Sequence, residues 1–93
     1  MRLLFEDRGW ADYLEWQAEG PKAVARVNAL LQDIRRSPFR GLGKPEPLRE
    51  NWTGFWSRRI TDEHRLIYRV VGKGDDQAIE VAQCRFHYAR RQG

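Results

Sequence analysis

The sequence has 93 residues, 32% of them charged, and a formal net charge of +4. A chain of this length is expected to fold as one domain over residues 1–93, and a hydrophobic share of 41% with four tryptophans supports a compact core. Its one cysteine, Cys84, excludes an intramolecular disulfide and a zinc site of the CxxC type. No run resembles a signal peptide or could cross a bilayer, so we expect a soluble, cytoplasmic protein without a membrane partner.

The positive charge is concentrated in the middle of the chain. Residues 1–34 carry a net charge of −2, residues 35–69 carry +5, and residues 70–93 carry +1. A local cationic surface attracts polyanions or an acidic partner. Charge alone fits a solvated arginine-rich face equally well, and both interpretations stay open at this point.

The chain begins with a predicted strand and a predicted helix. RLLFE at 2–6 has β character. From Asp7 the pattern changes, and a helix is predicted over 8–18. Helical spacing places four residues on one face, which we expect to join the core: Trp10, Tyr13, Leu14 and Gln17.

A second helix is predicted directly after the first. Gly20 suits the end of one helix and Pro21 the first turn of the next. The dipeptide Ser37-Pro38 ends this second helix. An apolar stripe runs along it and is also expected to be core: Val24, Val27, Leu30, Leu31 and Ile34.

A loop rich in glycine and proline follows, over residues 38–51. Such a sequence fits neither a helix nor a central strand. Long loops in small domains often serve function. Within it, Glu46 stands between Pro45 and Pro47, which restrict the backbone on either side of the carboxylate. Such restriction limits how far the carboxylate can move, although rigidity of the loop alone also explains the prolines.

Three strands joined by short turns complete the chain, over 55–60, 65–71 and 78–88. In the middle strand Leu66, Tyr68 and Val70 alternate with Arg65, Ile67 and Arg69. The order is therefore β-α-α-β-β-β. This order predicts an α+β fold, with a small, largely antiparallel sheet and two N-terminal helices on one face.

The two histidines are interpreted differently. His64 lies in the turn 61–64 and is predicted to be a hydrogen-bonding residue of the turn or strand edge. On an extended strand, His87 points to the same side as Gln83 and Arg85. Cys84 then shares the other side with Ala82 and Phe86, as a core residue rather than a nucleophile.

The polar side chains of the second half suit metal-free cleavage of RNA. A base takes the proton of a ribose 2′-hydroxyl, an acid protonates the leaving 5′-oxygen, and arginines stabilise the phosphorane. An aromatic ring can stack on a base. The candidate set is Glu46, Arg59, Arg65, Arg85, His87 and Tyr88. Nucleotide-binding motifs and clusters with metal-ligand spacing are lacking, so we expect no cofactor and no metal.

Several runs together resemble the YoeB-type toxins of the RelE/ParE toxin–antitoxin superfamily. They are PFRGLGKPEPL, NWTGFWSRRITDEHRLIYRV and the closing CRFHY, and the likeness extends over residues 1 to 88. It implies the microbial-RNase-like fold of that family, which agrees with the predicted order of elements. It also implies a ribosome-dependent endoribonuclease that enters the A site of the 70S ribosome, cuts the mRNA there and stops translation.

The resemblance also implies roles for individual residues. Glu46 would be the general base and His87 the general acid, while Arg65 would stabilise the phosphorane. Arg59 would assist on phosphate, and Arg85 joins the predicted substrate-binding set.

Two further residues of the expected substrate-binding set are Arg49, at a position where the family carries a basic contact to nucleic acid, and Tyr88, which would orient the RNA. The tail 89–93 and the turn GKGDDQ (72–77) depart from the family pattern. We expect the tail to be flexible and the turn to be a hairpin extension.

The implied partners are a YefM-like antitoxin, the ribosome with its mRNA, and a second copy, since such toxins can be dimers. Autoregulatory DNA would be bound only through the antitoxin. Two other functions remain open: a non-cleaving basic module that blocks the ribosome or another nucleic-acid machine, and a ParE-like gyrase poison.

Overall fold

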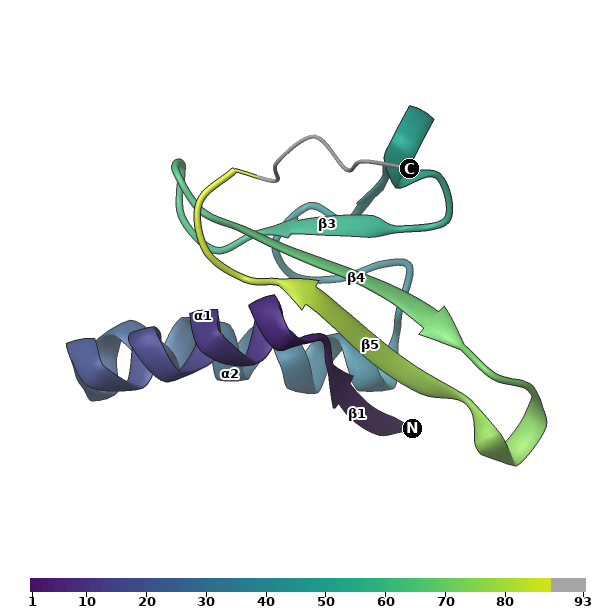
Figure 1. Ribbon diagram of the computed structural model, residues 1–93, viewed down its shortest axis with the longest axis horizontal. Coiled ribbons are helices and arrows are strands. Elements are labelled where there is room, and N and C mark those ends of the chain that lie inside the picture. Colours follow the sequence, from purple (N-terminus) through teal and green to yellow (C-terminus); the bar gives the residue numbers. More distant parts are fainter. Residues whose placement is uncertain (88–93) are drawn as a thin grey trace.

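The computed structural model describes residues 1–87 and consists of a five-stranded sheet with two helices (Figure 1). The strands are β1 (Arg2–Phe5), β2 (Glu46–Pro47), β3 (Trp56–Arg59), β4 (Arg65–Val71) and β5 (Ala78–Gln83). The helices are α1 (Asp7–Glu19) and α2 (Pro21–Arg36), with short 3₁₀ turns at Glu50–Trp52 and Gly74–Asp76. Within residues 1–87, neither helix is both long and apolar enough to cross a bilayer.

The strand order is β1-β5-β4-β3-β2, with β1 and β5 parallel and the other pairs antiparallel. The predicted α+β fold is confirmed. The sheet has one strand more than expected, because the loop 38–51 contains the two-residue strand β2. Pro47 lacks an N–H donor, which is tolerated here because β2 lies at the edge of the sheet.

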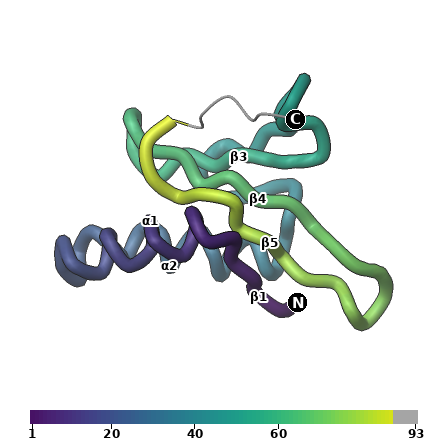
Figure 2. Tube along the Cα trace, in the orientation of Figure 1, coloured from purple at the N-terminus to yellow at the C-terminus, as the bar shows by residue number. Residues whose placement is uncertain are grey.

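Both helices lie on one face of the sheet, as predicted (Figure 2). The main core fills the space between the helices and the sheet. The stripe on α2 is confirmed, since Val27, Leu30, Leu31 and Ile34 are buried. They pack against side chains of the sheet and of its edges, which are Ile60, Leu66, Tyr68, Ile79, Val81 and Cys84. The alternation along β4 is confirmed too, because Ile67 belongs to a second apolar cluster with Leu48, Trp52, Phe55 and Ala82.

The predicted buried face of α1 is wrong for Trp10, Leu14 and Gln17, whereas Tyr13 packs half-buried against the core as expected. Trp10 and Leu14 are 48% and 45% exposed, whereas Gly9, Asp12 and Trp16 are buried. The reason is the closeness of α1 to β5: a Cβ atom on Gly9 would lie 2.5 Å from the Val81 carbonyl oxygen. Only glycine allows that approach. With Gly9 against β5, the polar Asp12 on the same side of the helix is buried too.

The last strand ends five residues earlier than predicted. After Gln83 the backbone N–H of Cys84 donates to Asp12 Oδ2 at 3.0 Å, and Phe86 has a φ of 62°. The chain therefore leaves the extended conformation, and the expected pairing of Cys84 with Ala82 on one face is wrong. Cys84 is in the helix-side core, as expected of a core residue, while Ala82 belongs to the other cluster.

Arg58 on β3 is fully buried, and its guanidinium group binds the loop between α2 and β2. It donates to the carbonyl oxygens of Ser37, Arg40 and Leu42 at 2.6, 3.0 and 3.0 Å. A 2.6 Å ion pair to Asp33 balances its charge. The buried cation is thus both neutralised and hydrogen-bonded, as a charge in a protein interior must be.

We expect Arg58→Met to lower the free energy of unfolding by about 3–5 kcal/mol, because it leaves Asp33 and three loop carbonyls without their donor. Urea denaturation measures the change. Arg36→Met is the matched control, since Arg36 binds the same carboxylate at 3.2 Å with a side chain that is 76% exposed. An exposed pair contributes about 0–1 kcal/mol, so equal losses in the two variants would contradict the role given to Arg58.

The stability of the fold is expected to depend on pH through Asp33. The Leu42 N–H, the Arg58 guanidinium and Arg36 bind its carboxylate and lower its pKa from 3.8 to about 2. Because the pKa is lowered on folding, the contribution of Asp33 is complete above 3.8 and is lost as the pH falls toward 2. The difference in unfolding free energy between the wild type and Asp33→Asn should therefore shrink over this range. The exposed Asp75→Asn is the control, and a constant difference for Asp33→Asn would contradict the assignment.

Candidate functional site

The loop before β2 holds Glu46 against β3. The Gly43 carbonyl accepts a 2.7 Å hydrogen bond from the Arg59 N–H. Gly43 has a φ of 80°, and a Cβ atom there would lie 2.9 Å from Leu30 Cδ2 and 3.0 Å from the Arg59 carbonyl oxygen. The loop can pass this closely only because the residue is glycine. Glu46 then pairs with Ser57, which fixes its position in the sheet.

The register of the sheet places three predicted site residues on one face. Glu46 is opposite Ser57, Ser57 is opposite Ile67, and Arg59 is opposite Arg65. Directly opposed residues of antiparallel strands point to the same side. Ile67 lies in the apolar cluster on the side away from the helices. Glu46, Arg59 and Arg65 therefore belong to that open face.

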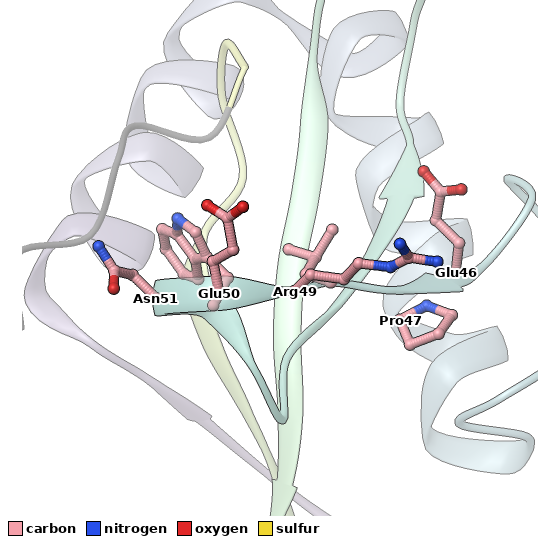
Figure 3. A pocket seen from close by; sticks show the side chains of 7 residues that line it. Glu46, Pro47, Arg49, Glu50 and Asn51 are labelled. Carbon is pink, nitrogen blue, oxygen red and sulfur yellow. The ribbon is translucent and has the colours of Figure 1, made fainter.

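A groove of about 990 Å³ lies beside this face, lined by residues 46–52 (Figure 3). The Arg49 side chain extends along it toward Glu46. Glu50, a second carboxylate of the groove that sequence reasoning did not single out, has a φ of 56°. A non-glycine residue in this conformation is uncommon, and no sequence pattern indicated it.

Arg65 is fixed by the turn that precedes β4. Its Nη1 donates to the carbonyl oxygens of Thr61, Asp62 and His64 at 2.8, 3.0 and 3.1 Å. These bonds hold the guanidinium group at the start of the strand. A cation held in this way loses little conformational entropy when it binds an anion.

The segment 84–87, which carries His87, is joined to the same end of β4. The Arg65 N–H donates to the Phe86 carbonyl at 3.0 Å. The exposed His87 accepts a 3.2 Å hydrogen bond from Gln83 Nε2 at its carbonyl oxygen. Gln83 is itself opposite Ile67, in the row that begins at Glu46. Tyr88 lies outside the described residues.

Arg85 lies against α1. Its Nε is 3.1 Å from Glu15 Oε2, its Nη1 pairs with Glu19, and the guanidinium carbon lies 4.7 Å from the Trp16 ring centroid. Glu19 raises the pKa of Arg85, so this arginine stays charged. These contacts give Arg85 a structural role, and its expected part in substrate binding stays a prediction.

His64 makes the kind of contact predicted for it. Its Nδ1 accepts a 2.6 Å hydrogen bond from the Phe86 N–H, and its carbonyl oxygen accepts the N–H of Ile60 at 3.0 Å. The predicted hydrogen-bonding role at the turn is therefore confirmed. A bond from residue 64 to residue 86 could not be read from the sequence.

The Cys84 thiol is a poor nucleophile. It is fully buried, and burial, followed by the charge of Asp12, raises its pKa from 9.0 to about 12. Only a thiolate attacks readily. Among residues 1–87, no three His, Cys, Asp or Glu side chains cluster as metal ligands would.

The chain matches a known family over nearly its whole length. The model of the YoeB-like toxin of bacterial type II toxin–antitoxin systems matches residues 5–88. This chain belongs to that family. Toxin YoeB of Escherichia coli K12 is 50% identical over 88 residues, which is 95% of this chain and 100% of that protein.

Solved YoeB structures share the fold. A YoeB/ParE toxin from Agrobacterium tumefaciens is 51% identical with a TM-score of 0.90, over 95% of this chain and 100% of that one. Two Staphylococcus aureus structures, a YoeB–YefM heterotetramer and a YoeB dimer, are 42% and 40% identical with TM-scores of 0.81 and 0.80. Each covers 95% of this chain and 98% of the YoeB chain. The YoeB-type fold and the toxin role predicted from the sequence are confirmed.

We expect Cys84 to resist alkylation in the folded protein. With a pKa of about 12, roughly one thiol in ten thousand is ionised at pH 8, and burial excludes the reagent. Mass spectrometry after iodoacetamide treatment measures the modified fraction, and the same protein in denaturant is the control. Rapid modification of folded protein would contradict the burial of this thiol.

Proposed function

We propose that this YoeB-family toxin is a ribosome-dependent endoribonuclease that cuts mRNA in the ribosomal A site. The observation that carries the proposal is the register that places Glu46, Arg59 and Arg65 on one open face. The hydrogen bond from the Arg65 N–H to the Phe86 carbonyl supports it, because it brings the segment of His87 to that end of the sheet.

In the proposed reaction, Glu46 removes the proton of a ribose 2′-hydroxyl, and the 2′-oxygen attacks the adjacent phosphorus. The bond from phosphorus to the 5′-oxygen breaks, and His87 protonates that oxygen. The products are a 2′,3′-cyclic phosphate and a 5′-hydroxyl. The reaction needs no metal or cofactor, because side chains supply both proton transfers.

The spacing of the strands leaves room for the scissile phosphate between base and acid. Gln83, which binds the His87 carbonyl, marks the end of the site that carries the acid. Glu46 on β2 and Gln83 on β5 are three strand spacings apart, roughly 14 Å between backbones. A glutamate and an imidazole that extend into this interval flank a phosphodiester. Arg65 and Arg59, on the strands between them, would bind its non-bridging oxygens and stabilise the dianionic phosphorane.

The groove beside Glu46 is proposed to hold the flanking RNA. Arg49 lines it and would contact a phosphate of the message. Tyr88 is proposed to orient the RNA, in line with the resemblance. The excess positive charge of residues 35–69 favours approach to the ribosome, a polyanion.

A YefM-like antitoxin is the proposed partner, because the S. aureus relative is solved in complex with YefM. A homodimer is proposed on the same ground, since S. aureus YoeB is solved as a dimer. DNA would be bound only through the antitoxin.

Glu46→Gln and His87→Gln are each expected to reduce cleavage of ribosome-bound mRNA by about 10²–10⁴-fold, because each removes one proton transfer. Primer extension on stalled ribosomes detects the cut in the A site, and circular dichroism confirms the fold. Undiminished cleavage by folded His87→Gln would remove His87 as the acid. If the wild-type protein stalls ribosomes but leaves the mRNA intact, the non-cleaving module is favoured. DNA damage in cells that express it would favour gyrase poisoning.

Glu50→Gln is the comparison for Glu46→Gln, because both carboxylates line the same groove (Figure 3). We expect a much smaller loss for Glu50→Gln. Similar losses in both variants would show that the groove needs negative charge rather than a general base at Glu46.

A further inference from the structure

His64 joins the chain after β5 to the start of β4, and it has no role in the proposed reaction. We propose that neutral His64 is a positioning residue, which accepts the Phe86 N–H at Nδ1 and thereby sets the position of the acid His87. The positioning of an acid rests on the proposed nuclease function, whereas the tautomer and the hydrogen bond can be tested without it.

The contacts of the ring determine which nitrogen carries the proton. Nδ1 accepts the Phe86 N–H at 2.6 Å, so this nitrogen must have a free lone pair. Nε2 lies 3.2 Å from Glu63 Oε2, where an N–H can donate to the carboxylate. Both contacts select the neutral tautomer with its proton on Nε2.

The ring is also held by packing. Its centroid lies 4.9 Å from the Trp16 ring in an edge arrangement and 5.0 Å from the Phe86 ring, and only 13% of the side chain is exposed. Trp16 in turn donates its indole N–H to the Cys84 carbonyl at 2.7 Å. His64 therefore contacts the segment 84–87 through a rigid, largely buried surface.

Two consecutive residues at the start of β4, His64 and Arg65, bind both polar groups of the Phe86 backbone. His64 accepts its N–H, and the Arg65 N–H donates to its carbonyl at 3.0 Å. Phe86 adopts a φ of 62°, in the left-handed region that disfavours residues other than glycine. The two hydrogen bonds offset this backbone strain. They fix the direction in which the chain continues into His87 relative to Arg65, the proposed phosphate ligand.

Protonation of His64 would break this arrangement. An imidazolium carries a proton on Nδ1, which then faces the Phe86 N–H donor to donor. The contact with the Phe86 N–H therefore requires the neutral ring.

Two substitutions separate positioning from packing. His64→Asn keeps an acceptor oxygen at the place of Nδ1, and His64→Leu fills the site without one. We expect His64→Leu to lower kcat about 10²-fold, the scale of a displacement of about 1 Å at a reacting group, with little change in KM. His64→Asn should remain within a few-fold of the wild type. Denaturation and circular dichroism identify a variant that fails to fold. Wild-type kcat in folded His64→Leu would overturn the positioning role alone.

NMR tests the tautomer independently of activity. Long-range ¹H–¹⁵N correlations of the full-length protein should show an unprotonated Nδ1 and a protonated Nε2. The Phe86 amide should shift in His64→Leu but stay near its wild-type position in His64→Asn. The opposite tautomer would overturn the inference. The expected spectra in a protein that cuts no mRNA would overturn the nuclease function, and the positioning role with it.

Discussion

The buried guanidinium group of Arg58 makes the contacts on which the open face of the sheet depends. Backbone carbonyl groups that face the protein interior need hydrogen-bond donors. Here one side chain supplies donors to three loop carbonyls, and Asp33 neutralises it. The next residue, Arg59, binds the Gly43 carbonyl. Glu46 enters the sheet three residues after Gly43. Its position therefore depends on the Arg58–Asp33 salt bridge, which lies on the other side of β3.

The two ends of the proposed site are fixed in different ways, and β4 with its turn relates them. Glu46 is placed by strand pairing through β3, with the register carried on to Ile67. The segment of His87 is outside the sheet, and side chains hold it, through Asp12 to Cys84 and through His64 to Phe86. Pairing gives a position that is costly to change. Side-chain hydrogen bonds give a position that a single substitution can change.

The sequence predicted those parts of the fold that depend on periodicity. The α2 stripe and the alternation along β4 were right because many residues repeat the same signal. The buried face of α1 was wrong because one residue, Gly9, decided the approach to β5. The role of Arg58 was missed although a signal existed: its position in β3 places it with Trp56 and Ile60 on the helix side, where an arginine needs a partner. The end of β5 depends on Asp12 and His64, far away in the chain, and periodicity carries no information on such pairs.

The arginines among residues 1–87 differ in whether they form an ion pair. Arg58, Arg69 and Arg85 pair with carboxylates of the protein, as do Arg8 and Arg36. Within residues 1–87, Arg49, Arg59 and Arg65 make no ion pair. The net charge of residues 35–69 therefore overstates the positive charge that is available to a ligand, because carboxylates of the protein neutralise part of it. Arg49, Arg59 and Arg65 belong to what remains, and they lie on or beside the face that carries Glu46. A polyanion bound there would relieve the repulsion between these arginines.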